Sequence, residues 1–171
     1  MQIRVDDLSG QVIRALIVEH LNEMRGLSPA CSVHALDLDG LTRPDVTFWT
    51  AWRDGELLGC GAMKEPTVAH GEIKSMRTAS AHRREGVASA LLRHIVSEGR
   101  TRSYERLSLE TGAGPAFEPA RRMWIGRWSA ALCECTRSVT IRGATFASAP
   151  ETDWQHRSLR CNENCKNNGP A

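Results

Sequence analysis

The spacing of apolar residues in the first third of the chain predicts one strand and two helices. Residues 2–5 form a short strand. Apolar residues then recur every three or four positions, the period of a helix with one buried face; they are Leu8, Val12, Ile13, Leu16, Ile17, Leu21 and Met24. Asp6 or Asp7 is expected to cap this helix. Ser28-Pro29 ends it, and a second short helix is expected at residues 32–38.

The middle of the chain changes to the pattern of strands joined by short turns. Residues 46–52 are rich in β-branched and aromatic side chains, and Asp54-Gly55 predicts a hairpin turn that returns the chain through residues 56–64. The remaining predicted elements are a strand at 71–78, a helix at 86–98 ending near Gly99, a strand at 106–110 and a short helix at 115–124. A meander followed by strand–helix–strand predicts an α+β fold with a mixed, mostly antiparallel sheet flanked by helices.

The composition narrows the class of protein without changing this layout. The 171 residues are 41% apolar and 25% charged, which is typical of one soluble globular domain. The net charge is +2 without a long basic run, so nucleic acid is not an expected partner. No apolar stretch reaches the roughly 18 residues of a membrane-spanning helix, so a membrane is not an expected partner either. No secretory signal is visible, and Cys31 and Cys60 are expected to be buried or half-buried thiols. Both features favour the cytoplasm.

The most informative chemistry lies in the turn between the strand at 71–78 and the helix that follows. This turn is basic and carries Arg83, Arg84 and Gly86. Free N–H groups at a helix start, together with the helix dipole, favour an anion there. The two arginines can pair with phosphate oxygens, and Gly86 has no Cβ to hinder a close approach. The segment therefore predicts a cradle for a polyphosphate.

The spacing Arg83-x-x-Gly86-x-Ala88 resembles the acetyl-CoA pyrophosphate motif of the GNAT superfamily of N-acetyltransferases. The resemblance covers residues 1–122 and includes the blocks His70-Gly71-Glu72-Ile73-Lys74-Ser75-Met76-Arg77-Thr78 and Leu107-Ser108-Leu109-Glu110-Thr111-Gly112. It implies acetyl-CoA as cosubstrate and an amine of a small molecule or peptide as acceptor. It also implies that the main chains of Met76 and Thr78 pair with the pantetheine arm. The implied cofactor-binding residues are Met76, Arg77, Thr78, His82, Arg83, Arg84, Glu85, Gly86, Val87, Ala88 and Ser89.

Glu72 is the expected general base. It lies sixteen residues before the end of the cradle motif, where histone-type members of the superfamily place a base glutamate. A carboxylate there can accept an amine proton through water. His70, two residues earlier on the same strand face, and His34, on the acceptor side, are the alternatives. Glu72 can equally be an ordinary strand residue paired with Lys74 or Arg77.

The chain departs from the family pattern after Arg122. The family's tyrosine, which commonly protonates the leaving thiolate, is matched by Trp124, and an indole N–H cannot do that work. Four of the six cysteines follow at residues 133–165. Their spacing does not suit a zinc site, so no bound metal is expected. We therefore divide the chain into an acetyl-CoA-binding domain at 1–122 and an atypical tail at 123–171.

The tail is interpreted as translated out of frame or disordered, and reading the coding DNA in the other two frames tests this. Residues 138–141 have the pattern of a strand, but the two closing strands of the fold are not visible in the sequence. Incomplete closing strands predict exposed apolar surface and an open sheet edge. We accordingly expect a marginally stable chain with weak or no transferase activity.

Two functions remain open from the sequence: an acetyl-CoA-dependent N-acetyltransferase, and a degenerate, non-catalytic member that at most binds CoA. The region after residue 122 distinguishes them, because the cradle is the same in both. Asp37 and Asp39 could attract a cationic amine, and Glu110 and Thr111 could line the cofactor cleft or only shape the gap between strands. The acceptor and the choice between monomer and homodimer are not determined by the sequence.

Overall fold

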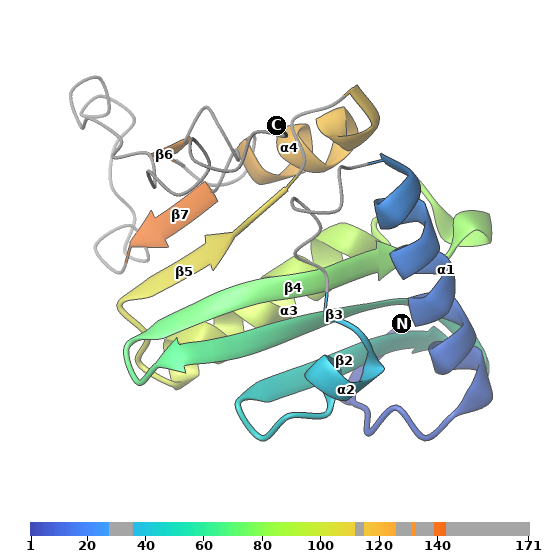
Figure 1. Cartoon of the computed structure of the whole chain (residues 1–171), viewed down its shortest axis with the longest axis horizontal. Helices are drawn as coiled ribbons and strands as arrows, with labels where there is room; N and C mark the ends of the chain where they lie inside the picture. The colour runs from blue at the N-terminus through green and yellow to red at the C-terminus, as the bar shows by residue number, and fades with distance from the viewer. Residues whose placement is uncertain (28–35, 112–114, 126–130, 133–138, 143–171) are drawn as a thin grey trace, which may run out of the picture.

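The protein is described here by a computed structural model, which places residues 1–27, 36–111, 115–125, 131–132 and 139–142 (Figure 1). A seven-stranded sheet in the order β1-β2-β3-β4-β5-β7-β6 forms its centre. Only β4 and β5 run parallel, and every other neighbouring pair is antiparallel. This confirms the α+β fold with a mixed, mostly antiparallel sheet flanked by helices.

The strands of the sheet are β1 (Gln2–Val5), β2 (Val46–Arg53), β3 (Glu56–Thr67), β4 (His70–Thr78), β5 (Arg106–Leu109), β6 (Ala131–Leu132) and β7 (Val139–Arg142). The α-helices are α1 (Gln11–Leu27), α2 (Leu38–Leu41), α3 (Val87–Thr101) and α4 (Glu118–Ile125), with 3₁₀ turns η2 (Ser80–His82) and η3 (Pro115–Phe117). Among the described residues, none of these helices is long and apolar enough to cross a membrane.

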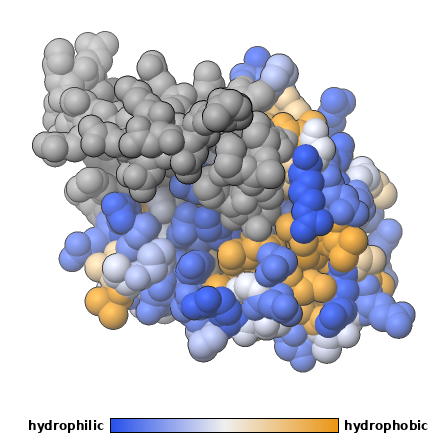
Figure 2. Space-filling model, viewed as in Figure 1, coloured by the Kyte–Doolittle hydropathy of each residue, from blue (hydrophilic) through white to orange (hydrophobic). Residues whose placement is uncertain are grey.

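Helices cover both faces of the sheet because its strands alternate apolar side chains between the two faces. On one face α1 and α2 pack over a cluster that includes Phe48, Cys60 and Ala62. On the other face α3 packs over Trp49 and Ile73, and α4 adds Ala120 and Met123 to the same cluster. Figure 2 shows the face with α1 and α2, where apolar residues gather beside polar ones.

The β2–β3 hairpin forms as the sequence predicts. Asp54 and Gly55 have φ of 50° and 82°, and two consecutive left-handed residues are what a two-residue type I′ turn requires. The return strand continues to Thr67, three residues beyond the predicted end. Cys60 is buried as expected, and burial raises the pKa of its thiol to about 12, so it stays protonated. Cys31 lies outside the described residues.

The predicted cap of the first helix is wrong. α1 begins at Gln11, and the Asp6 and Asp7 carboxylates instead accept hydrogen bonds from the N–H groups of Leu8 (2.8 Å) and Ser9 (3.0 Å). These are local turns that compete with helix formation. The other Asp6 oxygen accepts a bond from the buried Thr50 hydroxyl at 3.1 Å, so Asp6 fastens the end of β1 to β2 rather than capping a helix.

Two further helix boundaries differ from the prediction. The predicted helix at 32–38 is replaced, within the described residues, by α2, which starts at Leu38 and is capped by Asp37 through a 2.8 Å bond from the Gly40 N–H. α3 does not end near Gly99 but continues to Thr101. Gly99 faces Leu107 of β5, whose side-chain atoms lie 3.0 Å from the position of an added Cβ. The glycine therefore allows α3 to pack closely on the sheet instead of ending the helix.

The two closing strands that the sequence did not reveal are present but short. β7 pairs antiparallel with β5 over Val139–Arg142, and β6 adds two residues beside it. The predicted strand at 138–141 is thus found one residue later. β7 covers the edge of β5, and the expectation of incomplete closing strands agrees with the lengths of β6 and β7.

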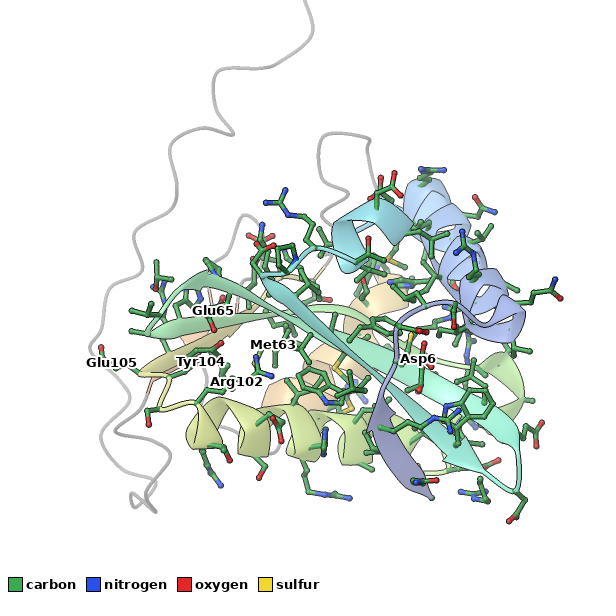
Figure 3. The ribbon with its side chains drawn as sticks, turned by 90° about the horizontal axis from the view of Figure 1, so that it is seen from below. Asp6, Met63, Glu65, Arg102, Tyr104 and Glu105 are labelled. Carbon is green, nitrogen blue, oxygen red and sulfur yellow. The ribbon has the colours of Figure 1, made fainter. Side chains whose placement is uncertain are left out.

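The end of the sheet at the C-terminus of α3 is fastened by polar contacts of Tyr104 and Arg102 (Figure 3). The Tyr104 hydroxyl donates a hydrogen bond to the Glu65 carboxylate, and the Arg102 guanidinium lies 5.8 Å from the centre of the Trp49 ring. Burial, followed by the bond to Glu65, raises the pKa of Tyr104. These contacts join β2 and β3 to the α3–β5 turn, and they lie at the opposite end of α3 from the predicted cradle.

Candidate functional site

A fork between β4 and β5 forms the centre of the candidate site. The two strands pair only from His70↔Arg106 to Ile73↔Leu109, whereas β4 continues five residues further to Thr78. Within that extension Ser75 has φ of 48°, and the register with β3 shifts, so β4 carries a bulge. A bulge bends its strand, and this one lies just beyond the last residue pair with β5.

Main-chain groups of β4 face this fork. The Ala79 N–H donates to Leu58 O at 2.9 Å. Because neighbouring residues of an antiparallel pair alternate in direction, the N–H and C=O of Thr78 point away from β3, towards the fork. The Met76 side chain packs against the core beneath α3. The main-chain role of Met76 and Thr78 towards a pantetheine arm stays a prediction.

The predicted cradle lies at the end of β4, where the chain turns into α3. Gly86 is the N-cap of α3 with φ of 80°, and no side chain caps the helix. Arg84 also has a left-handed φ, of 69°. The first N–H groups of α3 therefore point outward without a capping side chain. Arg83, three residues before Gly86, has a 56% exposed side chain whose guanidinium lies 3.9 Å from a carboxylate oxygen of Glu23 in α1. An exposed helix start with neighbouring cations can hold an anion of several charges.

Two predicted cofactor-binding side chains, Glu85 and His82, pair with each other and with residues of the β2–β3 hairpin. Glu85 accepts a 2.9 Å bond from Arg53, and that bond is the main cause that lowers the pKa of the Glu85 carboxyl. His82 lies between Glu85 and Glu56, at 3.4 and 3.1 Å. These pairs connect the β2–β3 hairpin to the cradle and turn the Glu85 carboxylate towards Arg53. Of the remaining residues of the motif, Val87 is buried, while Ala88 and Ser89 are half-buried in the first turn of α3.

The Arg77 side chain is held by two carboxylates of α1. Its guanidinium, 9% exposed, donates to Glu19 at 2.7 Å and to Glu23 of α1. The bond from Arg77 is the main cause that lowers the pKa of Glu19. The nearby His20 ring is buried, which with the Arg77 charge lowers its pKa to about 4, so it is neutral near pH 7. Arg77 thus fastens α1 to β4, and only its main chain is available to a cofactor in the fork.

Glu72 lies on the face of β4 that carries α1, with Lys74 two residues further along the same face. The Lys74 ammonium lies 2.7 Å from a Glu72 carboxylate oxygen and 3.6 Å from a carboxylate oxygen of Glu110, the residue after β5. Of the two ion-pair partners that the sequence suggested for Glu72, Lys74 is therefore the one present. Glu72 lies beside the fork, at the level where β4 and β5 separate.

His70 is engaged at both ring nitrogens. Arg106 donates to Nδ1 at 2.8 Å, so Nε2 carries the proton and donates to the Ser108 hydroxyl at 2.7 Å. Burial, and then the charge of Arg106, lowers the pKa of His70. A neutral imidazole with both nitrogens occupied has no free lone pair for an incoming amine. His70 is thus less suited to proton abstraction than Glu72.

Some predicted positions lie outside what the structure describes. His34 falls in 28–35, and the cysteines after residue 132 fall in 133–138 and 143–171. Thr111 is described and is half-buried immediately after Glu110. Among the described residues, no three His, Cys, Asp or Glu side chains lie close enough to hold a metal ion.

Sequence reasoning missed the contacts that hold the site together. The pairing of Arg77 with Glu19 and Glu23 joins residues more than fifty positions apart. The repeat of glutamates four apart on α1 was the available signal, because such residues share one helix face. The alternation of charged and apolar residues from His70 to Lys74 likewise indicated a polar strand face.

Comparison with known proteins assigns the family. The sequence model of the acetyltransferase (GNAT) family matches residues 14–125, about two thirds of the chain. This protein therefore belongs to the GNAT family. The chain is similar to the uncharacterized N-acetyltransferase YsnE of Bacillus subtilis (strain 168), with 53% identity over 124 residues that cover 72% of this chain and 82% of YsnE. It is similar also to the uncharacterized N-acetyltransferase YedL of Escherichia coli (strain K12), with 44% identity over 123 residues, 72% of this chain and 77% of YedL.

Solved structures share the fold at low sequence identity. A Klebsiella pneumoniae protein described as an acyl-CoA N-acyltransferase superposes with a TM-score of 0.66 at 21% identity, covering 82% of this chain and 96% of that one. A GNAT acetyltransferase from Elizabethkingia anophelis, solved with acetyl-CoA bound, superposes with a TM-score of 0.54 at 13% identity over 82% of this chain and 97% of its own.

Proposed function

We propose that this protein transfers the acetyl group of acetyl-CoA to a primary amine of a small molecule or peptide. The observation that carries the proposal is the fork between β4 and β5 that leads directly to the uncapped start of α3 at Gly86. A pantetheine arm fits an opening with unpaired main-chain groups, and a pyrophosphate fits a helix start flanked by arginines. Membership of the GNAT family and the acetyl-CoA held by the Elizabethkingia anophelis structure support this choice of cosubstrate.

Each part of the cofactor has a proposed set of residues. The pyrophosphate is held by the segment His82, Arg83, Arg84, Glu85, Gly86, Val87, Ala88 and Ser89, mainly through its N–H groups and the two arginines. The pantetheine arm pairs with the main chains of Met76, Arg77 and Thr78. The Arg77 side chain has no role in this binding, because Glu19 and Glu23 hold it on α1.

Glu72 is the proposed general base. The neutral amine attacks the thioester carbonyl, the nitrogen–carbon bond forms, and the carbon–sulfur bond breaks. Glu72 takes the amine proton, directly or through one water, and the sulfur leaves as a thiolate that is then protonated. His70 is the second candidate, but Arg106 and Ser108 occupy both of its nitrogens. Trp124, at the position of the family's tyrosine, cannot supply the proton to sulfur.

Acetyl-CoA binding and an amine panel together test the function. We expect calorimetry to give a micromolar dissociation constant for acetyl-CoA and mass spectrometry to detect an acetylated product from at least one primary amine. The panel combines arylalkylamines, polyamines, amino acids and short peptides. Binding without any acetylated product would favour the degenerate, non-catalytic alternative. A folded chain that does not bind acetyl-CoA would contradict both.

We further propose that residues 123–171 form an atypical tail that reduces activity. Support comes from the family match, which ends at residue 125, and from the shortness of β6 and β7, which close the sheet. Replacing this tail by the corresponding segment of the B. subtilis relative is expected to raise the melting temperature by at least about 5 °C and to raise the turnover rate. Equal stability and activity in the two chains would contradict the proposal. A chimera with this chain's tail on the B. subtilis domain is the matched control.

A further inference from the structure

The apex of the fork is bridged by one side chain. Ile73 and Leu109 are the last paired residues of β4 and β5, and Lys74 and Glu110 are the residues immediately beyond them. The Lys74 ammonium reaches across the opening to a carboxylate oxygen of Glu110 at 3.6 Å. Lys74 and Glu110 thus make the first contact after the backbone pairing stops, at the point where the fork opens.

The same ammonium also holds Glu72. Its nitrogen lies 2.7 Å from a Glu72 oxygen, a short, charge-assisted hydrogen-bond distance. The two side chains are 11% and 18% exposed, so this pair is much less accessible to water than an ordinary surface ion pair. A fixed partner limits the directions in which the Glu72 carboxylate can point.

Lys74 also separates two like charges. Glu72 and Glu110 both direct a carboxylate oxygen at one nitrogen, from two strands that no longer pair beside it. Without the ammonium the two carboxylates would repel each other, and both Glu72 and the opening of the fork would lose their fixed geometry. Lys64 lies opposite Glu72 in the β3–β4 register, and its charge acts on Asp45.

We propose that Lys74 is a positioning residue for the transfer reaction: by bridging Glu72 and Glu110 at the apex of the fork, it aims the Glu72 carboxylate at the amine. The proposal rests on the proposed role of Glu72 as base. Lys74 itself neither contacts the cofactor nor moves a proton in this scheme. It is not needed for acetyl-CoA to bind, because the cradle and the free main chain of β4 lie beyond the bulge at Ser75.

The test compares K74M, K74R and the matched control K64M, each with and without E72Q. The rate of CoA release is measured in two assays. The first contains the best amine of the panel, and the second contains no amine and reports the slow hydrolysis of acetyl-CoA by water. We expect K74M to lower kcat at least about tenfold, with the KM for acetyl-CoA and its calorimetric Kd changed less than about threefold. K74R restores most of the rate because it can bridge the same carboxylates, and K64M leaves it unchanged.

The double variants separate positioning from a general structural role. If Lys74 acts through Glu72, then K74M adds little to the loss already caused by E72Q, because the two residues act as one unit. Additive losses, or a K74M enzyme with unchanged kcat, would overturn the proposal. Failure of the underlying function gives a different result: E72Q alone would then leave the rate unchanged, or the wild-type chain would release no CoA at all.

Discussion

Replacing Gly86 with glutamate is expected to abolish measurable acetyl-CoA binding without unfolding the protein. Gly86 caps α3 with φ of 80°, and an added Cβ meets no atom within 4 Å, so the side chain projects into open space at the helix start. A carboxylate there occupies the proposed pyrophosphate position and repels it. Because like charges brought together cost several kcal/mol, we expect the Kd to rise at least about 100-fold. Calorimetry measures the binding, and the melting temperature measures the fold.

Two control variants isolate the cause of this loss. Gly86→Ala tests the backbone alone, since an L-residue at positive φ costs roughly 1 kcal/mol without adding charge; it should weaken binding only slightly. Gly55→Glu introduces the same residue at a hairpin glycine with φ of 82° and equally open surroundings, outside the start of α3 itself. It should lower stability as much as Gly86→Glu and leave Kd unchanged. Equal affinity of wild type and Gly86→Glu would show that the pyrophosphate lies elsewhere.

The features that the sequence predicted are those decided by neighbouring residues. The Asp54-Gly55 turn requires two left-handed residues in succession, and few dipeptides other than this type supply them. The start of α3 is equally local, because Gly86 and the basic residues before it lie within one turn. Strand and helix types from β2 to β5 follow from side-chain periodicity over short windows. Local signals of this kind were sufficient to place the turn from β4 into α3 at Gly86.

Features that depend on tertiary packing could not be predicted in this way. A glycine commonly marks the end of a helix, yet α3 continues through Gly99, where the glycine instead lets the helix pack closely on Leu107. Aspartate is a residue type that commonly caps helices, yet the Asp6 carboxylate accepts a hydrogen bond from the Thr50 hydroxyl across the sheet. The direction of the Arg77 side chain depends on how α1 lies over β4, which no local pattern encodes. For that reason the sequence could place Arg77 in the motif but could not show that α1 occupies its guanidinium.

The Ser75 bulge is another non-local feature with a consequence for the site. Serine has no special preference for φ of 48°, so nothing in the sequence marked this position. The bulge changes which side chains of β4 face each side of the sheet. Before it, Glu72 and Lys74 share the α1 face. After it, Met76 faces the core under α3 and Arg77 faces α1. Without the bulge, simple alternation would place Met76 beside Lys74 and Arg77 under α3. The separation of the face that carries the proposed base from the main chain proposed to face the cofactor therefore depends on one irregular residue.

Glu72→Gln is expected to lower kcat by about 100- to 1,000-fold while leaving acetyl-CoA affinity unchanged, because a positioned general base contributes roughly that much to proton transfer. Glutamine has the same shape, and its amide oxygen can still accept a bond from Lys74, so the fork should keep its geometry. The matched control is Glu105→Gln, at an exposed glutamate in the turn before β5. The measurement is CoA release with the best amine of the panel, with binding measured separately by calorimetry.

The alternative base gives the opposite pattern. If His70 takes the proton, His70→Gln lowers kcat and Glu72→Gln leaves it within about threefold of wild type, which would reduce Glu72 to a strand residue paired with Lys74. The structure argues against that result, because a hydrogen bond from Arg106 occupies Nδ1 and the Nε2 proton is donated to Ser108. Burial also lowers the pKa of His70 and so weakens it as a base. Glu72 needs no such rearrangement: a carboxylate has several acceptor positions, and Lys74 leaves some of them available to an amine or a bridging water.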